Sequence, residues 1–309
     1  MPLLSIIVAL VLEQAKPLAT SRVDGVLGRW ARFLDRHLNA GEPRHGLVAW
    51  LLGAALPALL VLLAGLATHW GNRLFGLAFD IGVLYVTVGF RQFSHFYTDI
   101  HLALRMGEVE RARGLLARWR GQSAERLGSG EVARLAIEQA LLSSHRHVFA
   151  PLFWFVLLGP GGAVAYRLAL FLAGAWGDRE DREFGDFGRF SRRAFALMDW
   201  LPVRATAIAF AVVGDFEGAV FCWRSQAGRW PDSSAGILLA SGAGALGVRL
   251  GGPTPGDGIL GDPAARPELG TNEEADPDFM QSTIGLVWRT LVMSLLLLAL
   301  LIVATWVGG

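Results

Sequence analysis

The chain has 309 residues, a formal net charge of +1, a mean hydropathy of +0.41 and 53% hydrophobic residues. So apolar a composition argues against an ordinary water-soluble protein, and a net charge this small excludes a general attraction to nucleic acid. The single cysteine, Cys222, excludes an internal disulfide, and the single lysine, Lys16, excludes a phosphate-binding or Schiff-base lysine elsewhere.

The N-terminal region lacks a clear membrane crossing. Residues 2–12 are apolar but too short to cross about 30 Å of hydrocarbon, so we expect a buried or interfacial helix, with a short first span as the alternative. Residues 13–46 are polar and basic. Within them Trp30, Phe33, Leu34 and Leu38 recur at helical spacing, which predicts a helix that lies on a surface.

Four stretches have the length and hydropathy of membrane spans. Residues 47–67 are uncharged, and a helix of that length measures about 31 Å, enough for one crossing. Residues 74–90, 148–176 and 286–307 complete the set, and we expect the third of these to break at Gly159-Pro160. The apolar stretch Ala205–Val213 is either a short re-entrant segment or a core helix.

The connection 91–147 contains nine arginines. Because basic residues between spans remain on the cytoplasmic side, this pattern predicts a cytoplasmic connection in a bacterial inner-membrane protein. The arginines either set the topology and solvate a helix face or form a site for an anion. The predicted fold class is therefore all-α: a single polytopic helical membrane domain over residues 1–309. It has four membrane segments, or five or six if the two doubtful stretches also insert, and helical loops.

Several residues stand out as candidates for ligand binding. An acid at membrane depth usually faces a partner or a wet cavity, so Asp80 is expected to pair with Arg167, either as a structural lock or in a polar cavity. Arg204 flanks an apolar stretch. Residues 241–270 are rich in Gly and Pro and predict a loop, in which backbone N–H groups and Arg249 could hold an anion. The histidines form no metal-binding motif, and we expect neither a metal nor another cofactor.

One stretch carries a family resemblance. The segments IEQALLSSHRHVFAPLFWF and GPGGAVAYR, within residues 137–167, and MDWLPVRATAIAFAVVGDFEGAVFCW resemble the AmpE signalling-modulator family. That family belongs to the larger CobD/CbiB superfamily of cobamide-biosynthesis membrane proteins. The stretch AGALGVRLGGP (residues 243–253) and the following Gly261-Asp262-Pro263 are more similar to the cobamide enzymes.

Departures from the cobamide pattern favour the signalling branch. Beyond the matching Glu138, acids and amides of that pattern are replaced, and its N-terminal Gly-Asp-Pro loop is absent. The positions concerned hold Leu142, Ser143, Arg146, Phe195, Ala196, Asp199 and the apolar run 168–171. Amide formation from ATP needs Mg²⁺ held by carboxylates and phosphates. The resemblance therefore implies loss of synthase activity.

The resemblance therefore implies an AmpE-like inner-membrane protein in the regulation of β-lactamase induction or cell-wall stress signalling, and we expect neither enzymatic activity nor catalytic residues. Two alternatives stay open: an ATP-dependent adenosylcobinamide-phosphate synthase of cobalamin biosynthesis, and a ligand-binding or transport protein. The expected partners are the lipid bilayer and a small anionic ligand resembling a muropeptide or a corrinoid. The candidate ligand-binding residues are Asp80, Glu138, Tyr166, Arg167, Arg204 and Arg249.

Overall fold

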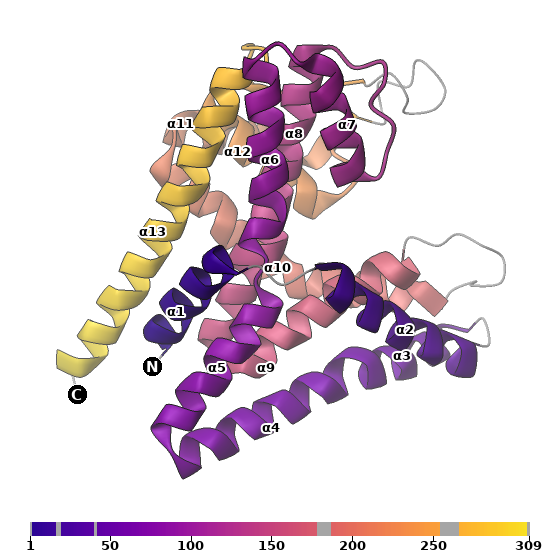
Figure 1. Ribbon diagram of the computed structural model, residues 1–309, viewed down its shortest axis with the longest axis vertical. Coiled ribbons are helices and arrows are strands. Elements are labelled where there is room, and N and C mark those ends of the chain that lie inside the picture. The colour runs from indigo at the N-terminus through magenta and orange to yellow at the C-terminus, as the bar shows by residue number, and fades with distance from the viewer. Residues whose placement is uncertain (1, 17–19, 40–41, 178–186, 254–265, 308–309) are drawn as a thin grey trace. The chain divides into compact units, whose positions relative to one another are not determined.

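The computed structural model describes residues 2–16, 20–39, 42–177, 187–253 and 266–307 (Figure 1). Nearly all of these residues are helical. The regular strands among them are two short ones, β1 (Arg249–Gly251) and β2 (Glu268–Gly270), which pair antiparallel with Leu250 opposite Leu269. The predicted all-α class is therefore confirmed. Residues 254–265, which include the Gly261-Asp262-Pro263 motif, lie outside the described part of the chain.

By its contacts the chain divides into two compact units. Unit 1 comprises residues 1–90 and 146–202, and unit 2 comprises residues 91–145 and 203–309. We describe each unit by itself. The single-domain organisation of residues 1–309 stays a prediction.

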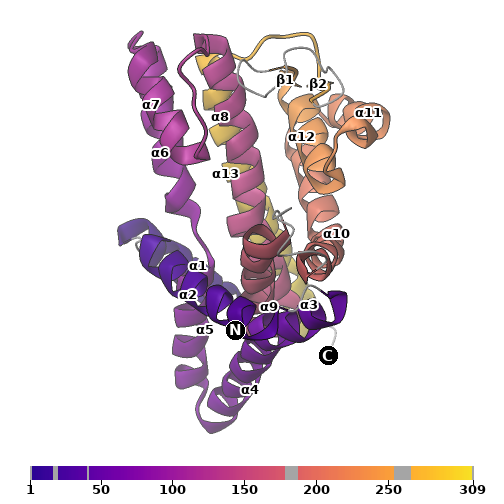
Figure 2. The same ribbon diagram turned by 90° about the vertical axis from the view of Figure 1, so that its right-hand side faces the viewer.

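Unit 1 is built from helices that include the π-helical turns η1 and η3 and most of a third such turn, η2. Its elements are α1 (Pro2–Ala15), α2 (Thr20–Leu38), α3 (Pro43–Trp50), η1 (Leu51–Ala55), α4 (Leu56–Gly71), α5 (Arg73–Thr87), α9 (Ala150–Leu172), η3 (Ala173–Gly177) and the first part of α10 (Phe187–Val213). The turn η2 (His145–Phe149) precedes α9. The side chain of Asn72 accepts a hydrogen bond from the N–H of Leu74 at 2.8 Å. It thereby caps α5 at the sharp turn from α4, visible in Figures 1 and 2.

Unit 2 contains the rest of α10 and a second group of helices. These elements are α6 (Phe90–Arg105), α7 (Val109–Arg120), α8 (Ser129–Ser144), α11 (Phe216–Gln226), the 3₁₀ turn η4 (Ala227–Arg229), α12 (Ser233–Leu246), β1, β2 and α13 (Pro277–Val307). The hydroxyl of Tyr97 on α6 donates to the carbonyl of Met280 on α13 at 2.9 Å. Burial raises the pKa of that phenol well above its ordinary value, so it remains a donor.

Four described helical stretches are long and apolar enough to cross a membrane: residues 44–71, 129–177, 187–213 and 277–305. The first and last agree with the spans predicted at 47–67 and 286–307. Their leucines face outward, as in a protein whose solvent is lipid: Leu60 is 57% exposed and Leu300 is 65% exposed. A polytopic membrane protein is therefore confirmed, whereas the cytoplasmic side of residues 91–147 stays a prediction.

The second predicted span, 74–90, is not among those four. Its helix α5 has 15 residues, about 22 Å of helix, which is less than the hydrocarbon thickness. Helix α5 ends at Thr87 because the next residue, Val88, is extended and the N–H of Gly89 donates to the carbonyl of His147 at 3.0 Å. In its place, α10 has the required length, although the sequence pointed only to the doubtful stretch Ala205–Val213.

The third predicted span, 148–176, folds back on itself. Gly159 has φ +65° and ψ −158° and precedes Pro160, so the helix breaks at the predicted position. Arg167 donates to Nδ1 of His147, although these two residues would stand about 30 Å apart in a straight helix. The region is therefore a bent helical pair rather than one straight crossing.

The Gly/Pro-rich region 241–270 was wrongly predicted to be entirely loop. Residues 241–246 belong to α12, and residues 249–251 and 268–270 form the two strands. A Cβ added at Gly244 would stand 2.2 Å from the carbonyl oxygen of Gly218 on α11. Ser241 donates to the carbonyl of Ala207 at 2.8 Å. The small residues therefore allow α12 to pack closely on neighbouring helices, as in many membrane proteins, and do not form a phosphate-binding loop.

Candidate functional site

The six candidate residues fall into different parts of the two units. Glu138, Arg204 and Arg249 belong to unit 2, and Asp80, Tyr166 and Arg167 belong to unit 1. We take the two groups in turn.

Glu138 forms an enclosed ionic contact in unit 2. It lies on α8, and its Oε1 accepts a hydrogen bond from the N–H of Gly251 at 2.8 Å. Its Oε2 accepts from Nη2 of Arg266, just before β2. Only 7% of the Glu138 side chain and 14% of the Arg266 side chain are exposed. Glu138 is therefore held on both oxygens.

The hairpin of β1 and β2 determines where Gly251 presents its amide. Gly251 has φ +74°, and an added Cβ would stand 2.2 Å from the carbonyl oxygen of Pro267. Gly252, which follows, has φ +78°. Two successive left-handed residues of this kind require glycine. In addition, Arg134 on α8 donates to the carbonyl of Pro253 at 3.0 Å, which ties the chain after β1 to α8.

A cavity of about 310 Å³ adjoins this ion pair. Besides Glu138 and Arg266, its lining consists of Arg120, Gln122, Leu135, Gln139, Leu142, Trp230, Pro231 and Leu239. The guanidinium of Arg266 lies 5.6 Å from the centre of the Trp230 ring, a cation–π distance. With two arginines, two amides and one carboxylate, the lining carries a net positive charge. It suits a small polar molecule with an anionic group.

The other two unit 2 candidates do not line this cavity. Arg249 on β1 donates to Oε1 of Glu274 at 2.8 Å, and the Glu274 side chain is 84% exposed, so this pair lies towards solvent. Arg204 is half-buried on α10, two residues before Thr206, whose hydroxyl lies 3.0 Å from Nδ1 of His145. The structure therefore brings Arg266, rather than Arg249 or Arg204, to Glu138.

Tyr166 and Arg167 belong to a polar group inside unit 1. The buried hydroxyl of Tyr166 donates to Oδ1 of Asp199 on α10 at 2.7 Å. Arg167 contacts His147, as described above. On the first half of α9, Nε1 of Trp154 donates to the carbonyl of Met198 at 3.2 Å. Both halves of α9 are thus anchored to the same turn of α10.

Asp24 on α2 also interacts with this group. Its pKa is raised by burial and lowered to a lesser extent by the charge of Arg167. The carboxyl of Asp24 is therefore less acidic than an exposed one. This interaction places the basic amphipathic N-terminal region close to the fold-back of α9.

The predicted pair of Asp80 with Arg167 is not formed. Oδ2 of Asp80 lies 3.0 Å from Nε2 of His69 on α4, and Arg167 contacts His147 instead. The Asp80 side chain is only 7% exposed, and its Oδ1 has no hydrogen-bond partner among the described residues. Asp80 therefore has a local partner across the α4–α5 turn, within the same hairpin.

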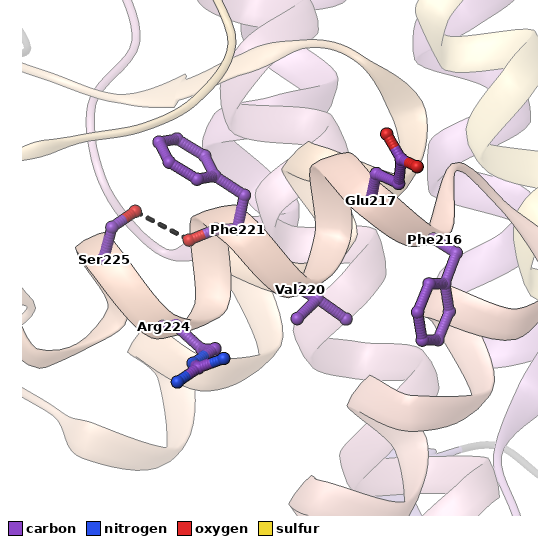
Figure 3. Close-up of a pocket in the computed structure, with 6 residues that line it drawn as sticks. All are labelled: Phe216, Glu217, Val220, Phe221, Arg224 and Ser225. Atoms are coloured by element: carbon purple, nitrogen blue, oxygen red, sulfur yellow. Dashed lines mark hydrogen bonds between the residues drawn. The ribbon is translucent and has the colours of Figure 1, made fainter.

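A larger hollow of about 490 Å³ runs along α11 (Figure 3). All six lining residues come from this one helix, and they include Phe216, Val220 and Phe221. A hollow on the outer side of one helix lacks the convergent polar groups of a binding site. Among the described residues there is also no group of three or more His, Cys, Asp or Glu side chains that could hold a metal ion.

Comparison with known proteins completes the description of the site. The family model described as "CobD/Cbib protein" matches residues 6–287. The chain is 36% identical to "Cobalamin biosynthesis protein CobD" of Stutzerimonas stutzeri over 88% of each chain. Proteins of the same name from Chromobacterium violaceum and Mycobacterium tuberculosis are 35% and 33% identical over 77% and 68% of this chain, and 76% and 69% of their own. No solved structure matches the chain significantly.

Proposed function

Because this chain belongs to the CobD/CbiB family, we propose that it catalyses a membrane-bound step of cobalamin biosynthesis. The step is the ATP-dependent amide formation between a corrinoid carboxylate and an amino-alcohol phosphate. The observation that carries this proposal is the similarity to proteins named "Cobalamin biosynthesis protein CobD" over most of both chains. We further propose that the membrane is the bacterial inner membrane.

The same relatives correct the prediction of an AmpE-like signalling protein. That prediction depended on three segments that resemble AmpE and on single positions, such as Leu142 and Phe195, where the cobamide pattern has acids or amides. The relatives that overturn it are similar over most of the chain and carry a cobalamin-biosynthesis name. They likewise give no support to the prediction that the protein is not an enzyme.

The cavity at Glu138 supports a role for unit 2 in holding the smaller substrate. A volume of about 310 Å³ is at the lower end of the range for small-molecule sites and is too small for a corrinoid ring system. An amino-alcohol phosphate has a phosphate that arginines recognise and an ammonium group that a carboxylate can accept. Arg120, Arg266 and Glu138 supply both kinds of group.

The reaction joins carboxylate carbon to amine nitrogen, and the oxygen that the carboxylate loses leaves with the phosphate cleaved from ATP. Nucleotide phosphates bring a divalent cation, which stabilises their developing charge. Among the described residues no group of three or more His, Cys, Asp or Glu side chains could hold such a cation without the nucleotide. The roles that we assign are therefore binding and orientation. Leu142 lines the cavity itself, so one departure from the cobamide pattern lies within the proposed site.

The test is complementation of a bacterial strain that lacks its own cobamide ligase and grows only with the finished cofactor. We expect this chain to restore growth and Glu138→Gln to abolish it. Arg111→Gln is a matched control, because Arg111 pairs with Glu108 at 2.9 Å on an exposed surface of α7. Failure of the wild-type protein to restore growth, when it is shown to be inserted and folded, would contradict the proposal.

A further inference from the structure

Helix α2 has two apolar faces, of which only one is covered. Its inner face, with Ala31 and Leu34 each 3% exposed, packs into a core that contains Trp176 and Phe187. Its outer face carries Val26, Trp30 and Phe33, which are 55%, 38% and 52% exposed. Large apolar side chains this exposed on one stripe mark an interaction surface.

The outer side chains form one ordered ladder, which we call the aromatic stripe: Val26, Trp30, Phe33 and His37. Their spacing of four, three and four residues places them along one line of the helix. The rings of Trp30 and Phe33 stack with centroids 5.9 Å apart. The rings of Phe33 and His37 follow at 4.3 Å. The stripe is thus pre-organised without a covering element among the described residues of unit 1.

A row of arginines, Arg29, Arg32 and Arg36, borders the aromatic stripe. All three are exposed, and none forms an ion pair with a described residue. The arginines of α7 differ, since Arg111 pairs with Glu108 at 2.9 Å and Arg113 pairs with Glu110 at 2.5 Å. The row on α2 therefore keeps its charge available for an external anion.

Helix α2 lies next to a candidate membrane span, both in the sequence and in space. Residues 39–43 join α2 to the candidate span 44–71, and a link of that length reaches about 20 Å at most. The contact is also direct, because a Cβ added at Gly53, inside that span, would stand 2.9 Å from Cδ1 of Leu34. Helix α2 therefore packs on the first part of a candidate membrane-spanning helix, beside α3 (Figure 1).

We propose that α2 is an in-plane membrane-surface helix that binds anionic phospholipid. The aromatic stripe enters the boundary between headgroups and acyl chains, and the arginine row binds the headgroup phosphates. Trp30 suits this depth because indole has an apolar body and a polar N–H. A soluble partner or a second copy of the chain would also cover the stripe, but charge complementarity and the adjoining membrane helix favour lipid.

Two neighbouring residues provide a matched test of the apolar half. In a Cys222→Ala background, Val26→Cys and Gly25→Cys are each labelled with an environment-sensitive fluorophore. Val26 lies on the stripe, and a side chain at Gly25 meets nothing within 4 Å. In nanodiscs we expect brominated acyl chains to quench the probe at position 26 and aqueous iodide to quench the probe at position 25. Iodide quenching at position 26, or no quenching there by either agent, would overturn the proposal.

Binding of anionic lipid by the arginine row is tested by a second experiment. The full-length protein is extracted from nanodiscs of phosphatidylcholine and phosphatidylglycerol, and the retained lipid is identified by native mass spectrometry. A basic residue at an anionic surface strengthens lipid binding about fivefold, so Arg29→Gln/Arg32→Gln/Arg36→Gln should lose the retained phosphatidylglycerol. The Arg111→Gln/Arg113→Gln control should keep it. Equal retention by the triple variant and the wild type would overturn the assignment of the arginine row.

Discussion

Removing either partner of the Glu138–Arg266 pair should destabilise unit 2 strongly. The side chains are 7% and 14% exposed, so solvent screens the pair weakly. Breaking a buried ion pair by removing one partner costs about 3–5 kcal/mol, because the other charge remains buried. Arg266→Met leaves Glu138 with the Gly251 amide as its described hydrogen-bond partner, and we expect a loss in that range.

A double variant measures the interaction free energy between Glu138 and Arg266 separately from the free energy that each substitution costs by itself. In Glu138→Gln/Arg266→Met neither member of the pair remains as an unpaired buried charge, and the side-chain amide that replaces the carboxylate can still accept from the N–H of Gly251. The double variant should therefore lose less free energy of unfolding than the sum of the two single variants. A coupling of about 1–3 kcal/mol is the usual size for residues in direct contact.

The assay is thermal unfolding in detergent, followed by tryptophan fluorescence for the wild type, both single variants and the double variant. A loss of 3–5 kcal/mol corresponds to a lower midpoint by about 5–8 °C for a chain of this size. Glu110→Gln is a suitable control, since the Glu110 side chain is 85% exposed and such an exposed carboxylate contributes about 0–1 kcal/mol through its ion pair. Additive losses within about 0.5 kcal/mol would refute the reasoning.

Three further predictions use the same thermal assay. Asp80→Asn and His69→Gln should show non-additive losses of about 1 kcal/mol, because the two side chains contact each other; additive losses would contradict the pair. Gly159→Ala should lower stability by about 1–3 kcal/mol, because φ +65° with ψ −158° is a conformation that essentially only glycine adopts, and an unchanged midpoint would contradict the strained fold-back. Burial, followed by the charge of Arg105, lowers the pKa of His101, so the unfolded chain binds its proton first. Stability should therefore fall as pH drops through about 6.5, and His101→Gln should flatten that slope; an identical slope would exclude His101 as the cause.

Hydropathy was sufficient to predict a membrane span where a single uninterrupted apolar run forms a single helix. The spans at 47–67 and 286–307 are long uninterrupted runs, and the structure has candidate spans over both. Hydropathy wrongly predicted a span at 74–90. The helix ends early there because Val88 is extended and the N–H of Gly89 donates to the carbonyl of His147, and both features depend on tertiary contacts. Hydropathy also could not reveal the fold-back of α9, although Gly159-Pro160 correctly marked the break.

The candidate site was predictable only in part. Glu138 was singled out by resemblance, and it does lie in a cavity. Its partner Arg266 is 128 positions away in the sequence, in a Pro- and Gly-rich stretch with no periodic signal. Charge at membrane depth suggested a pair of Asp80 with Arg167, but the α4–α5 turn brings His69 to Asp80 first. Which side chain pairs with a buried charge depends on how the helices pack, and a hydropathy profile does not contain that information.

The most direct measurement is product formation by the purified protein in nanodiscs. The protein is incubated with a corrinoid carboxylic acid, an aminopropanol phosphate, ATP and Mg²⁺, and the amide product is detected by mass spectrometry. We predict product that depends on ATP, together with its loss in Glu138→Gln and its retention in Arg111→Gln. If folded wild-type protein forms no amide product under conditions in which a relative forms it, the proposal that this protein catalyses the reaction is contradicted.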